Sequence, residues 1–273
     1  MWIDSHCHLD ADEFEPDREQ VVARALAAGV RMMLIPAVEV RTFERARDIA
    51  RRYGFGYTLG IHPLYVAHAV DTDLERLAEA VRSAQLDPNF VGIGEIGLDF
   101  HDGAPDAARQ EAFYEAQLRL ARAWSLPVVL HVRRSADRLL KYLRRIEVPG
   151  GIAHAFNGSE QQAHEFAALG LRLGFGGAAT FSGSLRIRKH ATQVPDDRIA
   201  LETDAPDIAP QWMHEAADGR RNEPVQLPRI AAVIAQLRST TPEHLAAINR
   251  RNVLDTFPRF AALAEARPLQ PAA

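Results

Sequence analysis

Short apolar runs alternate with longer amphipathic segments along most of this chain. The apolar runs are rich in strand-forming residues, and each has the length of a buried strand rather than of a helix. Eight such runs occur, at residues 2–9, 31–37, 56–63, 90–99, 127–132, 151–156, 171–177 and 198–205. The alternation predicts a series of parallel strand–helix units.

The segments between these runs have the spacing of amphipathic helices. They include residues 17–29, 41–54, 73–85 and 107–125, and several end at a Gly or are followed by a turn that contains Pro. Eight strands with helical crossovers predict a (β/α)8 TIM barrel. A doubly wound sheet would more often have fewer strands and a glycine-rich phosphate-binding fingerprint, which the sequence lacks. We expect one barrel domain over residues 1–266 and a frayed tail over residues 267–273.

Titratable side chains gather at the carboxyl ends of the predicted strands, where barrels carry their chemistry. Five of the eleven histidines are at strand ends, and four carboxylates accompany them. These residues are His6, His8, His62, His131, His154, Glu95, Asp99, Glu202 and Asp204. A scattered surface population would not sort in this way.

Alternation along the first strand places His6 and His8 on one face and Cys7 on the other. Cys7 is then expected to pack against helices as a small apolar residue. Asp4 is expected deeper on the face of His6, as a buried hydrogen-bond anchor. Two neutral imidazoles on one face of a barrel strand form half of a metal site, although a His-x-His pair alone is a weak pattern.

The combination of strand-end residues is more specific than any single one. Four imidazoles and two carboxylates in one barrel suit two divalent cations bridged by a carboxylate. The predicted ligands are His6, His8, Glu95, His131, His154 and Asp204. We predict two divalent cations, Mg²⁺, Mn²⁺ or Zn²⁺; four imidazoles favour zinc or manganese over magnesium, which prefers oxygen ligands.

Three further strand-end residues have open assignments. His62 either contacts the substrate or packs in the core. Asp99 could cap the following helix. Glu202 shares the face of Asp204 at a deeper position, and it could orient a ligand histidine as a hydrogen-bond acceptor.

Composition narrows the function classes. The only cysteine, Cys7, excludes an intramolecular disulfide and a cluster of thiolate ligands. The net charge of −4 argues against a large nonspecific nucleic-acid surface but leaves room for a small basic site. No stretch approaches the roughly 18 apolar residues that span a bilayer, and the first residues lack a secretory pattern. We expect a cytoplasmic monomer with no membrane partner.

The loops after the later strands carry positive charge. Arg133 and Arg134 follow the fifth strand, and the loops after the seventh and eighth strands carry Arg186, Arg188, Lys189, Arg220 and Arg221. Such a rim suits one end of a single-stranded nucleic acid or a small phosphodiester. Arg221 pairs either with a phosphate or with Glu223. The rim aromatics Phe156, Phe181 and Trp212 either stack on bases or pack the loops.

The chain resembles the TatD-type metal-dependent hydrolases, a family of amidohydrolase-like barrels often described as deoxyribonucleases. The resemblance rests on the ordered segments DSHCHLD, GIHP, GEIGLD, LHVRR, HAFNGS, LETDAP and GRRNEP, between residue 3 and about residue 260. It implies that His6, His8 and Asp204 hold one metal, that Glu95 bridges, and that His131 and His154 hold the second. Ala155, Asn157 and the long loop after LETDAP depart from the commoner family pattern, and the loop bears on substrate preference.

These observations lead to a ranked set of functions. The first is a phosphodiesterase or 3′–5′ exonuclease on single-stranded DNA, extending to RNA, with Asp204 as general base and Glu95 as the catalytic bridging carboxylate. In this nuclease function, His62, Arg133 and Arg221 bind the substrate. The second is an amide, ester or lactone hydrolase, such as an aminoacyl deacylase, with the same metal pair. A metal-binding or interaction protein without turnover is the third.

Overall fold

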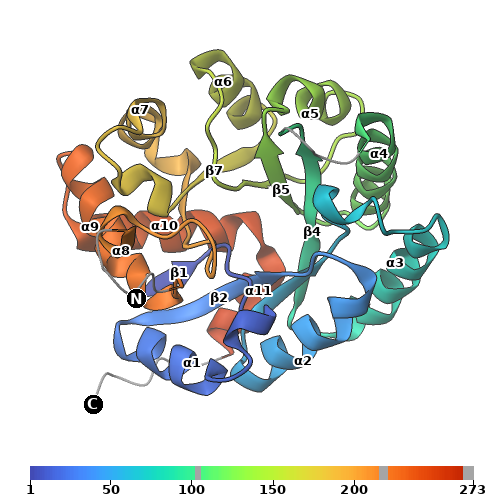
Figure 1. The fold of residues 1–273 in the computed structure, drawn as a ribbon, viewed down its shortest axis with the longest axis horizontal. Coiled ribbons are helices and arrows are strands. Elements are labelled where there is room, and N and C mark those ends of the chain that lie inside the picture. The colour runs from blue at the N-terminus through green and yellow to red at the C-terminus, as the bar shows by residue number, and fades with distance from the viewer. Residues whose placement is uncertain (102–105, 215–220, 267–273) are drawn as a thin grey trace.

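The computed structural model describes residues 1–101, 106–214 and 221–266. Eight strands form one sheet in sequence order, every paired neighbour being parallel, and helices surround the sheet (Figure 1). The strands are β1 Trp2–Asp4, β2 Val30–Pro36, β3 Gly56–Leu59, β4 Phe90–Asp99, β5 Val128–Arg133, β6 Gly151–Ala153, β7 Leu171–Phe175 and β8 Ile199–Leu201. The predicted (β/α)8 barrel is confirmed.

The helices connect consecutive strands and then close the barrel after β8. Their bounds are α1 Arg18–Ala27, α2 Phe43–Tyr53, α3 Thr72–Ser83, α4 Ala107–Ala123, α5 Ala136–Leu143, α6 Glu160–Ala168, α7 Leu185–Gln193, α8 Gln211–His214, α9 Leu227–Leu237, α10 Pro242–Thr256 and α11 Pro258–Glu265. None of the helices in the described ranges is both long and apolar enough to cross a membrane. The predicted tail, residues 267–273, lies outside the described residues.

All eight predicted strands exist, but several leave the sheet earlier than the apolar pattern suggested. β1 ends at Asp4 and β8 at Leu201, so the segments that carry His6 and Asp204 lie beyond regular strand pairing. These two segments still contact each other, because the Asp204 N–H donates to the His6 carbonyl at 2.9 Å. Asp204 itself has a φ of 56°, in the left-handed region. The candidate ligands His6 and Asp204 are thus held by a hydrogen bond between the two segments rather than by strand pairing.

Apolar side chains fill both sides of the sheet. A small cluster of buried residues includes Ile3, Val129, Ile152 and Ala200 from the strands and Phe257 from the helical closure. A much larger cluster lies between the strands and the surrounding helices. Because Val129 and Ile152 precede His131 and His154 by two residues, alternation directs these two histidines to the barrel interior above the smaller cluster.

One buried amide joins the first and last strands of the barrel. The Asn249 side chain, on α10, donates to the Ile3 carbonyl at 2.7 Å and accepts from the Leu201 N–H at 2.8 Å. Asn249 is fully buried. Its amide therefore satisfies one backbone group from each of the two strands, directly beneath the segments that carry His6 and Asp204.

Asn249→Ala is expected to lower the free energy of unfolding by about 2–4 kcal/mol, because each buried backbone group left unpaired costs about 1–3 kcal/mol. Urea denaturation followed by circular dichroism measures this change. Arg250→Ala, an exposed neighbour on the same helix, serves as the control and should leave the midpoint nearly unchanged. Equal stability of the two variants would contradict the role of Asn249 at the junction.

Candidate metal centre

The structure brings the strand-end residues together at the carboxyl ends of the strands. A cavity of about 1840 Å³ opens there, and five of the six predicted metal ligands line it: His8, Glu95, His131, His154 and Asp204. His6 lies beneath them and is fully buried. The site thus brings together residues that are up to 198 positions apart in the sequence. They come from β4 and β5 and from the segments after β1, β6 and β8.

Four donor atoms form a first compact set. The Nε2 atom of His6 lies 3.1 Å from Nε2 of His8, 3.2 Å from Oε2 of Glu95 and 3.4 Å from Oδ1 of Asp204. Nε2 of His8 lies 3.4 Å and 3.6 Å from the same two oxygens. Four ligands arranged tetrahedrally at about 2.0–2.2 Å from a zinc-like cation are separated by about 3.3–3.6 Å. The separations of 3.1–3.6 Å among these atoms are close to those of a tetrahedral metal site.

The second oxygen of Glu95 faces a different set of imidazoles. Its Oε1 atom lies 2.9 Å from Nδ1 of His131, 3.2 Å from Nε2 of His154 and 3.3 Å from Nε2 of His62. Glu95 has 1% of its surface exposed, so both oxygens are confined to these neighbours. One carboxylate between two sets of nitrogen donors is the arrangement expected of a bridging ligand.

His62 differs from the other imidazoles in its hydrogen bonding. Its Nδ1 atom accepts from the Leu64 N–H at 3.2 Å, so the neutral ring carries its proton on Nε2. Burial lowers the pKa of His62 to about 4, which keeps the ring neutral. The Nε2–H group then lies 3.3 Å from Oε1 of Glu95, whereas a metal ligand would need a lone pair there. His62 lines the cavity, which is compatible with the predicted substrate contact.

Asp99 orients His131 from behind. Its Oδ2 atom lies 2.9 Å from Nε2 of His131, while its Oδ1 atom lies 2.8 Å from Nδ1 of His101. A carboxylate that accepts from Nε2 leaves the Nδ1 lone pair of His131 directed at the centre. The alternative in which Asp99 caps the next helix is wrong, because Asp106 caps α4 by accepting from the Arg109 N–H.

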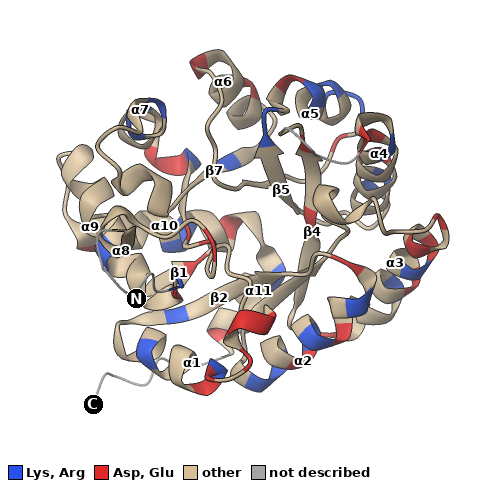
Figure 2. Ribbon diagram, viewed as in Figure 1, with Lys and Arg blue, Asp and Glu red and all other residues tan. Residues whose placement is uncertain are grey.

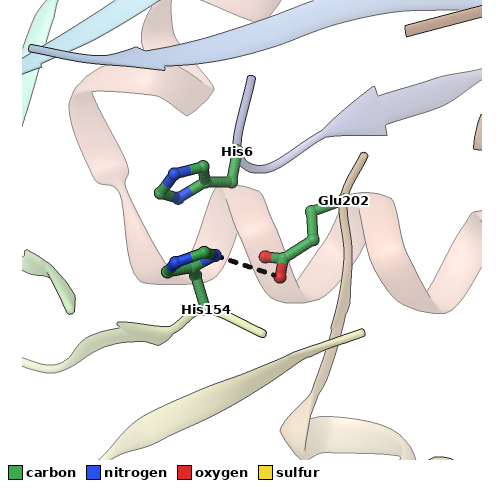
Figure 3. A group of neighbouring side chains, drawn as sticks. All are labelled: His6, His154 and Glu202. Carbon is green, nitrogen blue, oxygen red and sulfur yellow. Dashed lines mark ion pairs between the residues drawn. The ribbon is translucent and has the colours of Figure 1, made fainter. Parts of the chain in front are cut away.

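Glu202 lies behind His154 and next to His6 (Figure 3). Its Oε1 atom accepts from the Ala155 N–H at 2.6 Å and lies 3.5 Å from Nδ1 of His154. The His6 and His154 rings are stacked, with centroids 4.0 Å apart. Within the described ranges, Nδ1 of each ring and Oε2 of Glu202 have no hydrogen-bond partner. Glu202 is therefore placed to orient His154, as the sequence suggested.

The buried donors favour a positive charge at the centre. Burial disfavours protonation of His8, yet its hydrogen bond to Glu95 and the charges of Glu95 and Asp204 outweigh this and raise the pKa of His8 to about 9. Burial raises the pKa of Asp204 to about 6, against the pull of His154 and His8. The neighbouring carboxylates thus favour a positive charge at His8, although burial holds the pKa of His6 well below its usual value. The spacing, burial and chemistry of the donors all fit divalent cations.

Cys7 and Asp4, which lie next to His6 and His8 in the sequence, have structural roles. Cys7 is fully buried in the core between strands and helices, as predicted. Asp4 is a buried anchor, also as predicted: its carboxylate accepts from the Thr203 N–H at 3.0 Å and the Thr203 hydroxyl at 2.5 Å. Burial raises the pKa of Asp4 to about 7. Neither Asp4 nor His6 lines the cavity, and the Asp4 carboxylate also accepts from the His6 N–H at 3.3 Å.

The basic rim differs in part from the predicted one. Of the predicted cations, Arg133, Arg134 and Arg186 line the cavity, and Figure 2 shows the basic segment at the end of β5. Among the described residues, the carboxylate paired with Arg133 is Asp99, at 3.8 Å. Arg188 instead donates to the Ala179 carbonyl, and Lys189 pairs with Glu160. Arg220 lies outside the described residues.

The predicted substrate role of Arg221 is not supported by its position. Its guanidinium pairs with Asp17 at 2.5 Å and with Glu223 at 3.4 Å, and it lies over the Phe14 ring. Among the described residues that line the cavity, Arg221 does not occur. The predicted pairing of Arg221 with Glu223 is therefore the alternative that is observed. Through its contacts with Asp17 and Phe14, Arg221 holds the loop after β8 against the segment before α1.

The rim aromatics also have structural partners. Phe156 is fully buried and packs against Phe166, and the indole N–H of Trp212 donates to Gln226 at 3.0 Å. Phe181 packs edge-on against His214.

The cavity wall contains other side chains that the strand-end pattern does not identify: Asp10, Arg41, Arg45 and Tyr65. They lie several residues beyond their strands, where only their position in loops at the carboxyl end could have indicated them.

An eight-stranded α/β barrel with histidine and carboxylate donors at the carboxyl ends of its strands defines the class of metal-dependent barrel hydrolases. The sequence model described as TatD related DNase matches residues 3–258. The chain belongs to this family, and the predicted resemblance is confirmed.

Individual relatives cover nearly the whole chain. The uncharacterized metal-dependent hydrolase YjjV of Escherichia coli is 36% identical over 94% of this chain and 97% of its own. The 3′-5′ ssDNA/RNA exonuclease TatD of Cronobacter sakazakii is 37% identical over 93% and 97%. The crystal structure of Escherichia coli YjjV superposes with a TM-score of 0.87, covering 94% of this chain and 98% of that one.

Metal-free protein is expected to gain stability when Mn²⁺ or Zn²⁺ is added, since a ligand that binds only the folded state stabilises it by about 2.7 kcal/mol at a hundredfold excess over Kd. Thermal denaturation with and without metal measures the gain. His6→Ala should lose the part of the gain that comes from the first donor set. His164→Ala, at an exposed histidine of α6, is the matched control and should retain the full gain. A gain in His6→Ala equal to that of the wild type would place the binding elsewhere.

Proposed function

We propose that the chain is a metal-dependent phosphodiesterase that removes nucleotides from the 3′ end of single-stranded DNA, and also of RNA. The observation that carries this proposal is the Glu95 carboxylate, whose two oxygens face two sets of nitrogen donors at the base of one cavity. Membership of the TatD-related DNase family and the relative named as an exonuclease support the choice of substrate.

Two divalent cations are the proposed cofactors, with Zn²⁺, Mn²⁺ and Mg²⁺ as the candidates. His6, His8 and Asp204 would hold one, His131 and His154 the other, and Glu95 would contact both. When bound, the cations supply activation of a water molecule and charge to offset the negative phosphoryl oxygens. Four imidazoles favour zinc or manganese, whereas magnesium prefers oxygen ligands.

The side chains around the centre would divide the work of hydrolysis. Asp204 directs Oδ1 at the two imidazoles, which leaves Oδ2 to take a proton from the attacking water as general base. The Nε2–H group of His62 would donate to a phosphate oxygen, because its tautomer makes it a donor toward the cavity. The reaction requires no covalent intermediate.

Two arginines on the cavity wall would bind the phosphates of the strand. Arg133 is more than half exposed and has no carboxylate closer than 3.8 Å, and Arg186 has no ion pair within the described part of the chain. Guanidinium groups in this state suit phosphate oxygens. Because the cavity is closed below by the packed barrel interior, it suits the end of a strand better than a duplex. A monomeric, cytoplasmic enzyme remains the prediction from sequence.

The purified protein should shorten a 5′-labelled single-stranded oligonucleotide stepwise from its 3′ end in Mn²⁺ or Mg²⁺. Denaturing electrophoresis resolves the products, and Glu95→Ala should reduce the rate by at least about a hundredfold, because both donor sets lose their shared ligand. A strand blocked at its 3′ end should remain intact. Absence of cleavage with metal bound would refute the nuclease proposal and favour the amide, ester or lactone hydrolase, tested with aminoacyl esters and lactones.

Metal content should distinguish a bridging carboxylate from a ligand of one cation. Elemental analysis after dialysis is expected to find two cations per wild-type chain, one in His131→Ala and none in Glu95→Ala. Asp137→Asn, a carboxylate on the cavity wall that bonds to Gln162, is the matched control and should retain both. One cation in both the wild type and Glu95→Ala would exclude the shared site.

A further inference from the structure

The cavity wall carries one aromatic ring that neither the donor sets nor the phosphate contacts use. Among the Phe, Tyr and Trp side chains of the described residues, Tyr65 alone lines the cavity. Leu64, 37% exposed, lines it beside Tyr65. Together Leu64 and Tyr65 form an apolar ledge on the turn Pro63–Tyr65, which directly follows His62. Other apolar side chains also line the cavity, among them Val38, Val132 and Ile187, but none of them offers a flat ring to a bound molecule.

The backbone of the ledge is held rigidly. The Leu64 N–H donates to Nδ1 of His62, and the Tyr65 N–H donates to the His62 carbonyl at 2.9 Å. From α4, the Arg109 guanidinium donates to the Val66 carbonyl at 2.9 Å and to the Ala69 carbonyl at 2.6 Å. A ring on a segment fixed from both sides loses little conformational freedom when a ligand binds, which is the condition for an efficient stacking surface.

The ledge lies one imidazole away from the candidate metal centre. The Tyr65 ring meets the His62 ring edge to face, with centroids 6.0 Å apart, and Nε2 of His62 lies 3.3 Å from Oε1 of Glu95. The cavity arginines that suit phosphates are Arg133, the last residue of β5, and Arg186, at the start of α7, whereas the ledge follows β3. The cavity therefore presents an apolar ring and phosphate-binding cations on different loops around one centre, as a nucleotide requires.

We propose that Tyr65 is the surface on which the base of the 3′-terminal nucleotide stacks while the adjoining phosphodiester lies at the centre. This inference rests on the proposed function. The other rim aromatics are engaged in packing, so within the described chain they leave this role to Tyr65. Stacking on an aromatic ring tolerates every base, so Tyr65 selects for the presence of a base rather than for its identity.

The test is a double-mutant cycle between Tyr65 and the terminal base. Wild type, Tyr65→Leu and Tyr65→Phe are each assayed on two oligonucleotides in Mn²⁺, one intact and one with an abasic 3′-terminal nucleotide. Wild type should show a kcat/KM about 5- to 150-fold lower on the abasic strand, the range measured for loss of one stacked base. Tyr65→Leu should lose a similar factor on the intact strand, mainly through KM, and show little further loss on the abasic one.

Tyr65→Phe should restore the preference for the intact strand, because the ring rather than the hydroxyl carries the contact. Leu86→Ala, at a side chain that is 96% exposed and does not line the cavity, is the control for nonspecific effects. Equal losses by Tyr65→Leu on both strands would assign Tyr65 a purely structural role and overturn the inference. So would a wild type that cuts both strands equally, whether or not Tyr65→Leu folds.

Failure of the proposed nuclease function would give a different result. The wild type, with metal bound, would then cleave neither oligonucleotide, and both the nuclease proposal and the role of Tyr65 would be refuted. Cleavage of both strands without discrimination overturns only the role of Tyr65. The two failures are thus separated by the wild-type reaction on the intact strand.

Discussion

The burial of one carboxylate among five imidazoles is the constraint on which the rest of this structure depends. Glu95 is almost fully removed from solvent, and an uncompensated charge in such a position costs several kcal/mol. Both of its oxygens are therefore surrounded by nitrogen donors, at 2.9–3.4 Å. The chain segments after β1 and β6 carry three of these donors, the segment after β8 adds the Asp204 carboxylate, and Asn249 joins β1 to β8.

A second ring of carboxylates determines how the imidazoles are presented. Asp99 accepts from one nitrogen of His131, and Glu202 lies behind one nitrogen of His154, so the remaining nitrogen of each ring is directed at Glu95. His62 is held in the opposite sense, because a backbone N–H occupies its Nδ1 atom. The same residue type thus serves as a candidate metal ligand or as a hydrogen-bond donor, according to what lies behind the ring.

The sequence left the roles of several residues after the strands open, and for one physical reason. Arg221, Trp212 and Phe156 could each have met the substrate or packed the loops, because the directions of their side chains depend on partners elsewhere in the chain. Arg221 pairs with Asp17, which is 204 residues away, and such a partner is invisible to any local pattern. Tyr65 was overlooked for the same reason, since nothing near it in sequence indicates that its ring faces the cavity.

The sequence by itself determined the barrel, the order of its strands and the set of candidate ligands. It could do so because apolar periodicity specifies each strand, and because the carboxyl ends of eight parallel strands in a barrel must converge. Only the tertiary structure decided which nitrogen of each imidazole faces Glu95, which arginines reach the cavity and which aromatic ring lines it. Those features depend on hydrogen bonds and packing between loops that are distant along the chain.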